Sequence, residues 1–330
     1  MRQGPLRARP RCYLLPLLLN ECWGLRTVFV GEVAKYPRTG RYLNTLVARG
    51  TQIVEAFPPH NISSAEVMAC HAVPKAGVDA ARTDVVVHVK RPCVEARSAW
   101  PHALHVLDLL DGPLSGCGSL RWAAVVVTHR GITPCPGVPT VVVPHHAVRC
   151  ADEAAAAHER IDVLVVGVHP RTDLLKALSQ AKYSNYSIVD ESRFRERYLE
   201  ADAQARLDLI CDTLASARVA IAWDQGGSYD YKPAERVINP QACGIPTIAY
   251  SGYRSFREYG TILCATFACL DRELQRLLSD ETVRLRAGRV ALAKSEGLDL
   301  PSVAANYSET LVAIASRQRP PALREMRRHY

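Results

Sequence analysis

Short apolar runs rich in β-branched residues recur along this chain and alternate with segments in which apolar residues have helical spacing. The runs occupy residues 26–31, 51–56, 84–89, 103–108, 122–128 and 139–143, and then residues 162–167, 186–189, 219–222, 247–250 and 261–264. Runs of this length between helices are typical of buried parallel strands. The alternation predicts an α/β fold in which each series of strands forms a doubly wound sheet with crossover helices on both faces.

Length and composition are sufficient for two domains. The chain has 330 residues, of which 48% are hydrophobic and 22% are charged, and a single domain usually contains roughly 50–200 residues. We expect an N-terminal domain over residues 25–147 and a C-terminal domain over residues 148–330 that includes the C-terminal helices. The two should meet near residues 144–160, and the helix from Val303 is a candidate to pack back on the first domain.

Residues 231–250 predict a loop, a short helix, a tight turn and a buried strand in succession. Lys232 and Arg236 are four residues apart, so on a helix they share one face near its start. A helix start offers unpaired backbone N–H groups and a partial positive charge, so two added cations make a site for a phosphate or diphosphate. Gly244 stands where a helix ends, and Pro246 prevents its continuation.

The same segment resembles the donor-binding segment of GT-B glycosyltransferases of the family 1 and family 4 type. The matching residues are Lys232, Pro233, Arg236, Asn239, Gln241, Ala242, Gly244, Pro246 and Ile248. The resemblance implies two Rossmann-like domains that face a cleft. It also implies hexosyl transfer from a nucleoside-diphosphate sugar to an acceptor glycan or small molecule, with no separate cofactor. It covers the second half of the chain, whereas the first half is similar only in the order of its elements.

The resemblance also implies which residues bind the donor. Lys232 is the first choice for the diphosphate, and Arg171 is the second because it follows the first strand of the second series. Asp224 follows another strand, at the edge where doubly wound sheets bind ligands. Arg236 and Asn239 complete the set, with Asn239 placed to contact the donor ribose.

Asn239 departs from the pattern of many stereochemistry-retaining relatives. They carry a ribose-binding Glu at this position and a second Glu eight residues earlier, where this chain has Tyr231. An Asn side chain can still form a hydrogen bond with a hydroxyl group. The missing carboxylates leave the stereochemical course open and keep a catalytically inactive binding or scaffold protein as an alternative.

Three histidines that follow predicted strands are candidates for the base that activates an acceptor hydroxyl. They are His145, His146 and His129. Imidazole titrates near neutrality and can take up a proton, although a histidine in such a place is often a hydrogen-bonded structural residue. The adjacent pair lacks the spacing of two metal ligands on one helix face, so no metal site is predicted.

Several other function classes lack their sequence signatures. The dinucleotide pattern GxGxxG, the P-loop pattern and the GxSxG nucleophile elbow are absent, which argues against a dehydrogenase, an NTPase and an α/β-hydrolase. The net charge is +8, with arginines at both ends, but no interleaving of aromatic and basic residues predicts a nucleic-acid partner. Association with a membrane is an open alternative that no feature of the sequence supports. A different Rossmann-like enzyme that acts on a phosphorylated metabolite is the remaining alternative.

The N-terminus and the cysteines bear on localisation. Residues 1–24 form a leader whose apolar run at 12–19 resembles a weak signal segment and is too short to cross a membrane. The secretory pathway and the cytoplasm are therefore equal alternatives. The chain contains 11 cysteines, and Cys211, Cys243, Cys264 and Cys269 lie in apolar surroundings. This distribution predicts buried thiols rather than a framework of disulfides.

Overall fold

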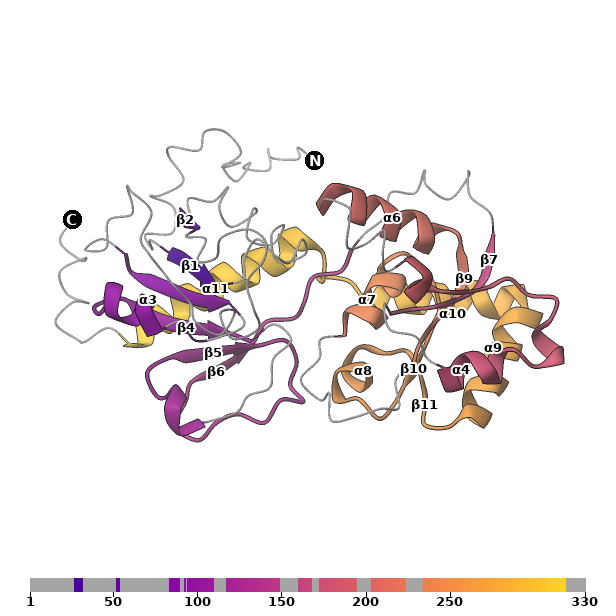
Figure 1. The fold of residues 1–330 in the computed structure, drawn as a ribbon, viewed down its shortest axis with the longest axis horizontal. Helices are drawn as coiled ribbons and strands as arrows, with labels where there is room; N and C mark the ends of the chain where they lie inside the picture. The colour runs from indigo at the N-terminus through magenta and orange to yellow at the C-terminus, as the bar shows by residue number, and fades with distance from the viewer. Residues whose placement is uncertain are drawn as a thin grey trace, which may run out of the picture.

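The computed structural model contains two parallel β-sheets (Figure 1). It describes residues 27–31, 52–53, 83–89, 92, 94–109, 117–148, 160–167, 172–194, 203–223 and 234–318. The first sheet consists of β1 (Thr27–Gly31), β2 (Gln52–Ile53), β3 (Val85–Val89), β4 (Leu104–Asp108), β5 (Ala124–Val127) and β6 (Thr140–Val142). The second consists of β7 (Ile161–Val165), β8 (Ile188–Asp190), β9 (Ala217–Ala222), β10 (Thr247–Tyr250) and β11 (Ile262–Cys264).

The order of the strands places a topological switch point in each sheet. The first sheet has the order β2-β1-β3-β4-β5-β6, and the second has the order β11-β10-β9-β7-β8. Numbered from the first strand of each series, the first sheet has the doubly wound order 2-1-3-4-5-6 and the second has the order 2-1-3-4-5. In both, the chain reverses its direction of progress across the sheet between strands 1 and 3. In the second sheet the switch point therefore lies between the carboxyl ends of β7 and β9.

Helices cover both faces of the second sheet. They are α4 (Thr172–Leu178), α6 (Ala203–Ala215), α7 (Glu235–Ala242), α8 (Arg254–Tyr259), α9 (Phe267–Ser279) and α10 (Glu281–Lys294), with the short helices η5 (Ala181–Tyr183) and η6 (Glu191–Phe194). On one face Leu174 of α4 and Leu274 of α9 pack with Val163 of β7. On the other face Leu214 of α6 packs with Leu164 of the same strand. Alternate residues of β7 therefore enter two different cores, which explains why the strand is apolar except at Asp162.

The last helix returns to the first sheet. Helix α11 (Leu300–Gln318) contributes Tyr307 and Leu311 to a core that also contains Val87 and Val126. Figure 1 shows this yellow helix beside the indigo and purple strands. The expectation that the helix near Val303 packs back on the first sheet is confirmed, while the domain limits at residues 147 and 148 stay a prediction. The other described helices of the first half are α3 (Val94–Ala99) and η3 (Cys117–Leu120).

The segment around Gly244 forms the predicted helix-to-strand corner. Gly244 has φ 72°, its N–H donates to Gln241 O at 2.9 Å, and the N–H of Ile245 donates to Pro240 O at 3.0 Å. These two bonds are the Schellman pattern, in which a glycine with positive φ ends the helix. The start of α7 differs from the prediction. The helix begins at Glu235, so Arg236 lies in its first turn, whereas Lys232 is outside both the helix and the described residues.

The prediction of buried thiols is wrong for two of the four cysteines named for it. Cys264, at the end of β11, forms a disulfide with Cys269 in the first turns of α9. A second disulfide joins Cys117 to Cys135. The apolar surroundings of a cysteine do not reveal whether a second sulfur lies within reach, because the fold determines that distance. Cys211 and Cys243 remain thiols.

Some predicted segments lie outside the described residues, and others begin or end at different residues in the structure. The leader over residues 1–24 is not among the described residues. The strand expected over 186–189 is β8 (Ile188–Asp190). Within the described part of the chain, no helix has the length and apolar character needed to cross a membrane.

Candidate active site at the switch point of the second sheet

Gly167 marks the switch point, directly beyond the carboxyl end of β7. Its φ is 131°, a backbone conformation that L-residues with a side chain rarely adopt. A Cβ atom at this position would lie 3.1 Å from Cζ of Arg236 and 3.2 Å from its Nε. Glycine is therefore required here both by the backbone angle and by the guanidinium that lies against it.

Arg236 reaches this edge because α7 is anchored beneath it. Val237 and Ile238, the next two residues, are buried in a core with Ala222 at the end of β9 and Ala249 of β10. This packing fixes the first turn of α7 over the carboxyl edge of the sheet. The guanidinium that lies against Gly167 thus belongs to a residue that the sequence analysis had singled out. The contact joins two positions that are far apart in the chain.

Glu191 is a site residue that the sequence analysis missed. It follows β8 directly, is 9% exposed, and accepts a hydrogen bond at Oε2 from the Gly167 N–H at 2.5 Å. This charge-assisted hydrogen bond fixes the backbone at Gly167. The rule that ligands bind beyond the carboxyl ends of strands was the available signal, but strand β8 was expected to end one residue earlier.

An aromatic wall borders the site at the end of β9. Trp223 is 2% exposed and stacks on Phe267 of α9, with a centroid separation of 5.3 Å and an interplanar angle of 23°. Its ring is also 5.1 Å from that of Tyr250 at the end of β10. Stacked and tilted aromatic rings add to the stability that burial alone provides. The wall stiffens the strand end just before the predicted donor residue Asp224.

Asn239 lies in α7 and binds the segment that leads into the second sheet. Asn239 is 5% exposed, and its Oδ1 accepts a hydrogen bond from the Val148 N–H at 3.0 Å. The oxygen of the amide therefore has a structural partner. Contact between Asn239 and a donor ribose stays a prediction, in which the amide nitrogen has the role of donor.

His129 lies in a loop that restricts its acid–base chemistry. The residue is completely buried, and its Nδ1 accepts a hydrogen bond from the Gly131 N–H at 3.1 Å. Because Nδ1 is the acceptor, the neutral ring carries its proton on Nε2. A ring in that state can donate a hydrogen bond from Nε2, and its basic nitrogen Nδ1 is already occupied by the Gly131 N–H, so His129 is poorly placed to act as a base.

His145 has a different arrangement. Its Nδ1 lies 4.0 Å from Oε2 of Glu235, the first residue of α7, and its side chain is 11% exposed. Its ring stacks on that of His146, with a centroid separation of 5.3 Å and an interplanar angle of 16°. His146 is 6% exposed. At 4.0 Å the Glu235 carboxylate is beyond hydrogen-bond distance of Nδ1, which has no hydrogen-bond partner among the described residues, so the carboxylate acts on the ring through its charge. Of the three candidate histidines, His145 has the surroundings that best suit a base.

The remaining predicted donor residues are not described by the structure. Arg171, Asp224 and Lys232 lie outside the described residues. Each precedes or follows a described segment, because Arg171 comes just before α4, Asp224 follows Trp223, and Lys232 comes just before Ala234. Their roles stay predictions. Among the described residues, no group of three or more His, Cys, Asp or Glu side chains could hold a metal ion.

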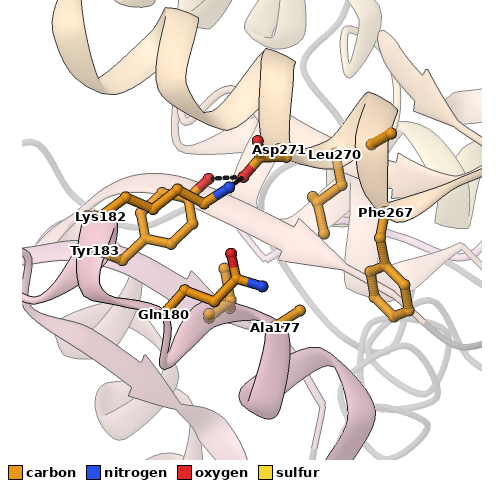
Figure 2. A pocket seen from close by; sticks show the side chains of 9 residues that line it. Ala177, Gln180, Lys182, Tyr183, Phe267, Leu270 and Asp271 are labelled. Atoms are coloured by element: carbon orange, nitrogen blue, oxygen red, sulfur yellow. Dashed lines mark hydrogen bonds and ion pairs between the residues drawn. The ribbon is translucent and has the colours of Figure 1, made fainter.

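A pocket of about 220 Å³ lies elsewhere, between the end of α4 with η5 and the start of α9. Figure 2 shows Lys182 and Tyr183 directed at Asp271 across its mouth, with Phe267 and Leu270 on its apolar side. Tyr183 Oη donates to Asp271 Oδ1 at 2.6 Å, and Lys182 forms an ion pair with the same carboxylate. The described candidates His129, His145, His146, Arg236 and Asn239 are not among the described residues that line it. The pocket shares Phe267 with the aromatic wall at the end of β9.

Comparison with known proteins identifies the fold. Neither a family profile nor a curated protein matches the sequence. A glycosyltransferase from Rickettsia africae ESF-5 superposes with a TM-score of 0.63 at 13% identity, over 90% of this chain and 100% of that one. Sucrose-phosphate synthase from Thermosynechococcus elongatus gives 0.61 at 12% identity, over 89% and 100%. AviGT4, a glycosyltransferase involved in avilamycin A biosynthesis, gives 0.50 at 16% identity, over 88% and 98%. The two parallel sheets and these likenesses over nearly the whole chain show that the protein has the GT-B glycosyltransferase fold.

Proposed function

We propose that this protein is a glycosyltransferase that moves a sugar from a nucleoside-diphosphate sugar to the hydroxyl group of an acceptor glycan or small molecule. The observation that carries the proposal is the guanidinium of Arg236 against Gly167 at the switch point of the second sheet. This is the place where doubly wound sheets bind ligands. The GT-B fold supports the reaction class, because the protein shares this fold with glycosyltransferases.

The reaction explains why cations belong at this edge. Transfer breaks the bond between the anomeric carbon of the sugar and an oxygen of the diphosphate, and negative charge accumulates on the departing diphosphate. A guanidinium fixed in place stabilises that charge more in the transition state than in the ground state. In the proposal Arg236 has this role, together with Arg171 and Lys232. Glu191 holds the backbone of Gly167, against which the Arg236 guanidinium lies.

The acceptor hydroxyl must lose a proton as it attacks. We assign the base to His145, whose Nδ1 faces Glu235, so that Nε2 takes up the proton. Glu235 then stabilises the imidazolium that forms. Asn239 is proposed to donate from its amide nitrogen to a hydroxyl of the donor ribose, while its Oδ1 stays bound to Val148. Asp224 completes the proposed donor site.

A catalytically inactive binding protein is the second candidate function. Asn239 and Tyr231 stand where carboxylates occur in many retaining relatives, and Asn239 Oδ1 already serves a structural bond to Val148. Such a protein would bind a nucleotide sugar and release no product. An enzyme that acts on a phosphorylated metabolite would instead bind that metabolite in preference to any nucleotide sugar.

One experiment separates these functions. The purified protein is incubated with UDP-, GDP- and ADP-hexoses, and both thermal stability and release of nucleoside diphosphate are measured. A glycosyltransferase gains stability with one donor and releases its diphosphate, because ligands that bind only the folded state stabilise it. An inactive binder gains stability without release. If no nucleotide sugar stabilises the protein, the proposal is wrong.

The variant Arg236→Met tests the site itself. Loss of a charge-assisted hydrogen bond worth about 1.5–3 kcal/mol should weaken nucleoside-diphosphate binding about 10- to 100-fold and leave binding of the bare nucleoside nearly unchanged. Arg289→Met, on the exposed side of α10, is the matched control because it removes the same charge away from the switch point. Equal losses for nucleoside and diphosphate would show that Arg236 does not bind phosphate.

A further inference from the structure

Three arginines lie around the amino-terminal edge of the second sheet, opposite the edge that carries Gly167. Arg160 directly precedes β7, and Arg218 is the second residue of β9. The two strands are parallel neighbours in which Ile161 pairs with Ala217, so both arginines lie at the amino end. Arg284 belongs to the first turns of α10. This helix begins at the amino-terminal edge of the sheet, because α9 has led the chain back there from the carboxyl edge.

Two carboxylates neutralise this cluster only in part. Arg218 Nη1 donates to Asp162 Oδ1 at 2.8 Å, and Arg160 Nε lies 4.0 Å from the same oxygen. The other oxygen of Asp162 accepts from the Ser187 N–H at 3.0 Å. Arg284 Nη2 donates to Glu281 Oε1 at 2.9 Å. Among the residues that the structure describes, three positive charges and two negative charges leave the cluster with an excess of one positive charge.

Two N–H groups of the cluster are buried without an acceptor. Within the described residues, Arg284 Nη1 and Arg218 Nε have no hydrogen-bond partner. The Arg284 side chain is only 8% exposed. Burial, together with the positive charge of Arg218, lowers the pKa of Arg284. Buried donors on charged groups are costly unless an acceptor meets them, and cations held near one another repel.

We propose that Arg160, Arg218 and Arg284 form a binding site for the phosphate group of a small anion, distinct from the donor site at the switch point. Guanidinium N–H groups match the oxygens of phosphate in geometry and charge. The phosphate oxygens accept from Arg284 Nη1 and Arg218 Nε, and a monoanionic phosphate balances the excess positive charge. Arg160 is 63% exposed on its side chain and connects the site to solvent.

The site is placed to affect ligand binding at the other edge. Strands β7 and β9 begin beside the arginine cluster and end at Gly167 and Trp223. An anion that ties Arg160 and Arg218 together holds the amino ends of these strands in register. The proposed site does not depend on glycosyl transfer, because it is defined by binding alone.

The test is thermal unfolding of the full chain in inorganic phosphate, compared with chloride at the same ionic strength. Saturating phosphate should raise Tm by about 3 °C, as expected for a ligand that binds only the folded state of a chain this size. Arg284→Met should abolish this shift. Arg289→Met, on the same helix but exposed, should retain it. Arg236→Met should also retain it, which separates this site from phosphate bound at the switch point.

Several results would overturn the proposal. They are an absent phosphate shift in the unmodified protein, a full shift in Arg284→Met, and a shift that disappears in Arg236→Met while it survives in Arg284→Met. An equal shift with succinate would reassign the site to carboxylates in general. If Arg284→Met does not fold, phenylglyoxal labelling of the unmodified protein decides the matter. Phosphate should protect Arg218 and Arg284 and leave Arg289 reactive, and equal labelling with and without phosphate would refute the site.

Discussion

Nη1 of Arg254 donates a hydrogen bond to the backbone oxygen of Gly131 at 2.8 Å, and so joins α8 of the second half to the loop after β5 of the first. The same short helix makes two further contacts with that loop. Glu258 Oε2 accepts from the Arg130 N–H at 2.9 Å, and Tyr259 Oη reaches Thr128 O at 3.5 Å. The loop that carries His129 is thus held by three side chains from one helix.

Gly131→Ala should loosen this junction. A Cβ atom at Gly131 would collide with Cβ of Arg254 and approach Nδ1 of His129, and overpacking of this kind costs about 1–3 kcal/mol. Denaturant unfolding should show the loss. Gly118→Ala is the control because a Cβ there meets nothing within 4 Å. Equal stability of the two variants would mean that α8 moves away at no cost.

Gly167→Ala should impair both stability and ligand binding. The new Cβ would press on the Arg236 guanidinium at 3.1 Å in a backbone conformation with φ 131°. Backbone strain costs on the order of 1 kcal/mol, and displacement of the guanidinium should weaken nucleoside-diphosphate binding about tenfold. Gly297→Ala separates the effects, because Gly297 has φ 76° with nothing within 4 Å of a Cβ. Equal nucleotide affinity in both variants would refute the role of Arg236.

Asn239→Ala should reveal two roles at once. Loss of the bond to the Val148 N–H should lower stability by about 1–3 kcal/mol, because a buried donor is left unpaired. If Asn239 also contacts ribose, affinity for a ribonucleotide donor should fall more than affinity for its deoxyribose analogue. Calorimetry gives the ratio of the affinities for the ribonucleotide donor and for its deoxyribose analogue. An effect of the variant on folding lowers both affinities equally and so cancels in this ratio. An unchanged ratio would leave Asn239 with its structural role only.

Stability should fall in mild acid because of two buried histidines. His88 Nε2 lies 2.9 Å from His105 Nδ1, and burial with the charges of His105 and Arg97 lowers the pKa of His88 to about 3. The folded state resists protonation, so the contribution of His88 is complete above the unfolded pKa of about 6.5 and is lost as pH falls from there toward 3.

Between pH 7 and pH 5 this histidine should therefore cost about 2 kcal/mol of unfolding free energy, since each pH unit below the unfolded pKa costs about 1.4 kcal/mol. Denaturant unfolding across this range is the measurement. His88→Gln should flatten the profile, whereas the same change at exposed His102 should not. A profile as steep in His88→Gln as in the unmodified protein would contradict this assignment.

The disulfide between Cys117 and Cys135 should stabilise the first half. It closes a loop over a sequence separation of 18 residues, for which loop-closure entropy predicts about 3 kcal/mol. Replacement of both cysteines by serine should lower Tm under oxidising conditions and should reduce its dependence on reductant to the part that comes from the Cys264–Cys269 bond. Cys211→Ser is the control because Cys211 remains a thiol. An unchanged Tm in the double variant would show that the bond contributes nothing.

Local patterns determined much of the fold. The apolar β-branched runs predicted strands such as β9 and β10, because burial on both faces requires continuous apolar residues. The end of α7 followed from Gly244 and Pro246, since a positive φ and a missing N–H act within a few residues. The sequence also singled out Arg236, through its spacing from Lys232 and the resemblance to the donor-binding segment of GT-B enzymes.

Tertiary structure alone decided which of these residues meet. Arg236 contacts Gly167 only because α7 packs over the switch point between β7 and β9, and no local pattern encodes that strand order. Glu191 joins the site through the same order, and the Cys264–Cys269 bond required a turn whose geometry apolar composition does not specify. The hydrogen bond of Asn239 likewise depends on a backbone N–H that is distant in the sequence, that of Val148. The hydrogen bond of His129 depends on a turn that brings the Gly131 N–H back to its ring. The local sequence determines whether each segment prefers to form a helix, a strand or a turn. The packing of segments that are far apart in the chain determines which side chains share a site.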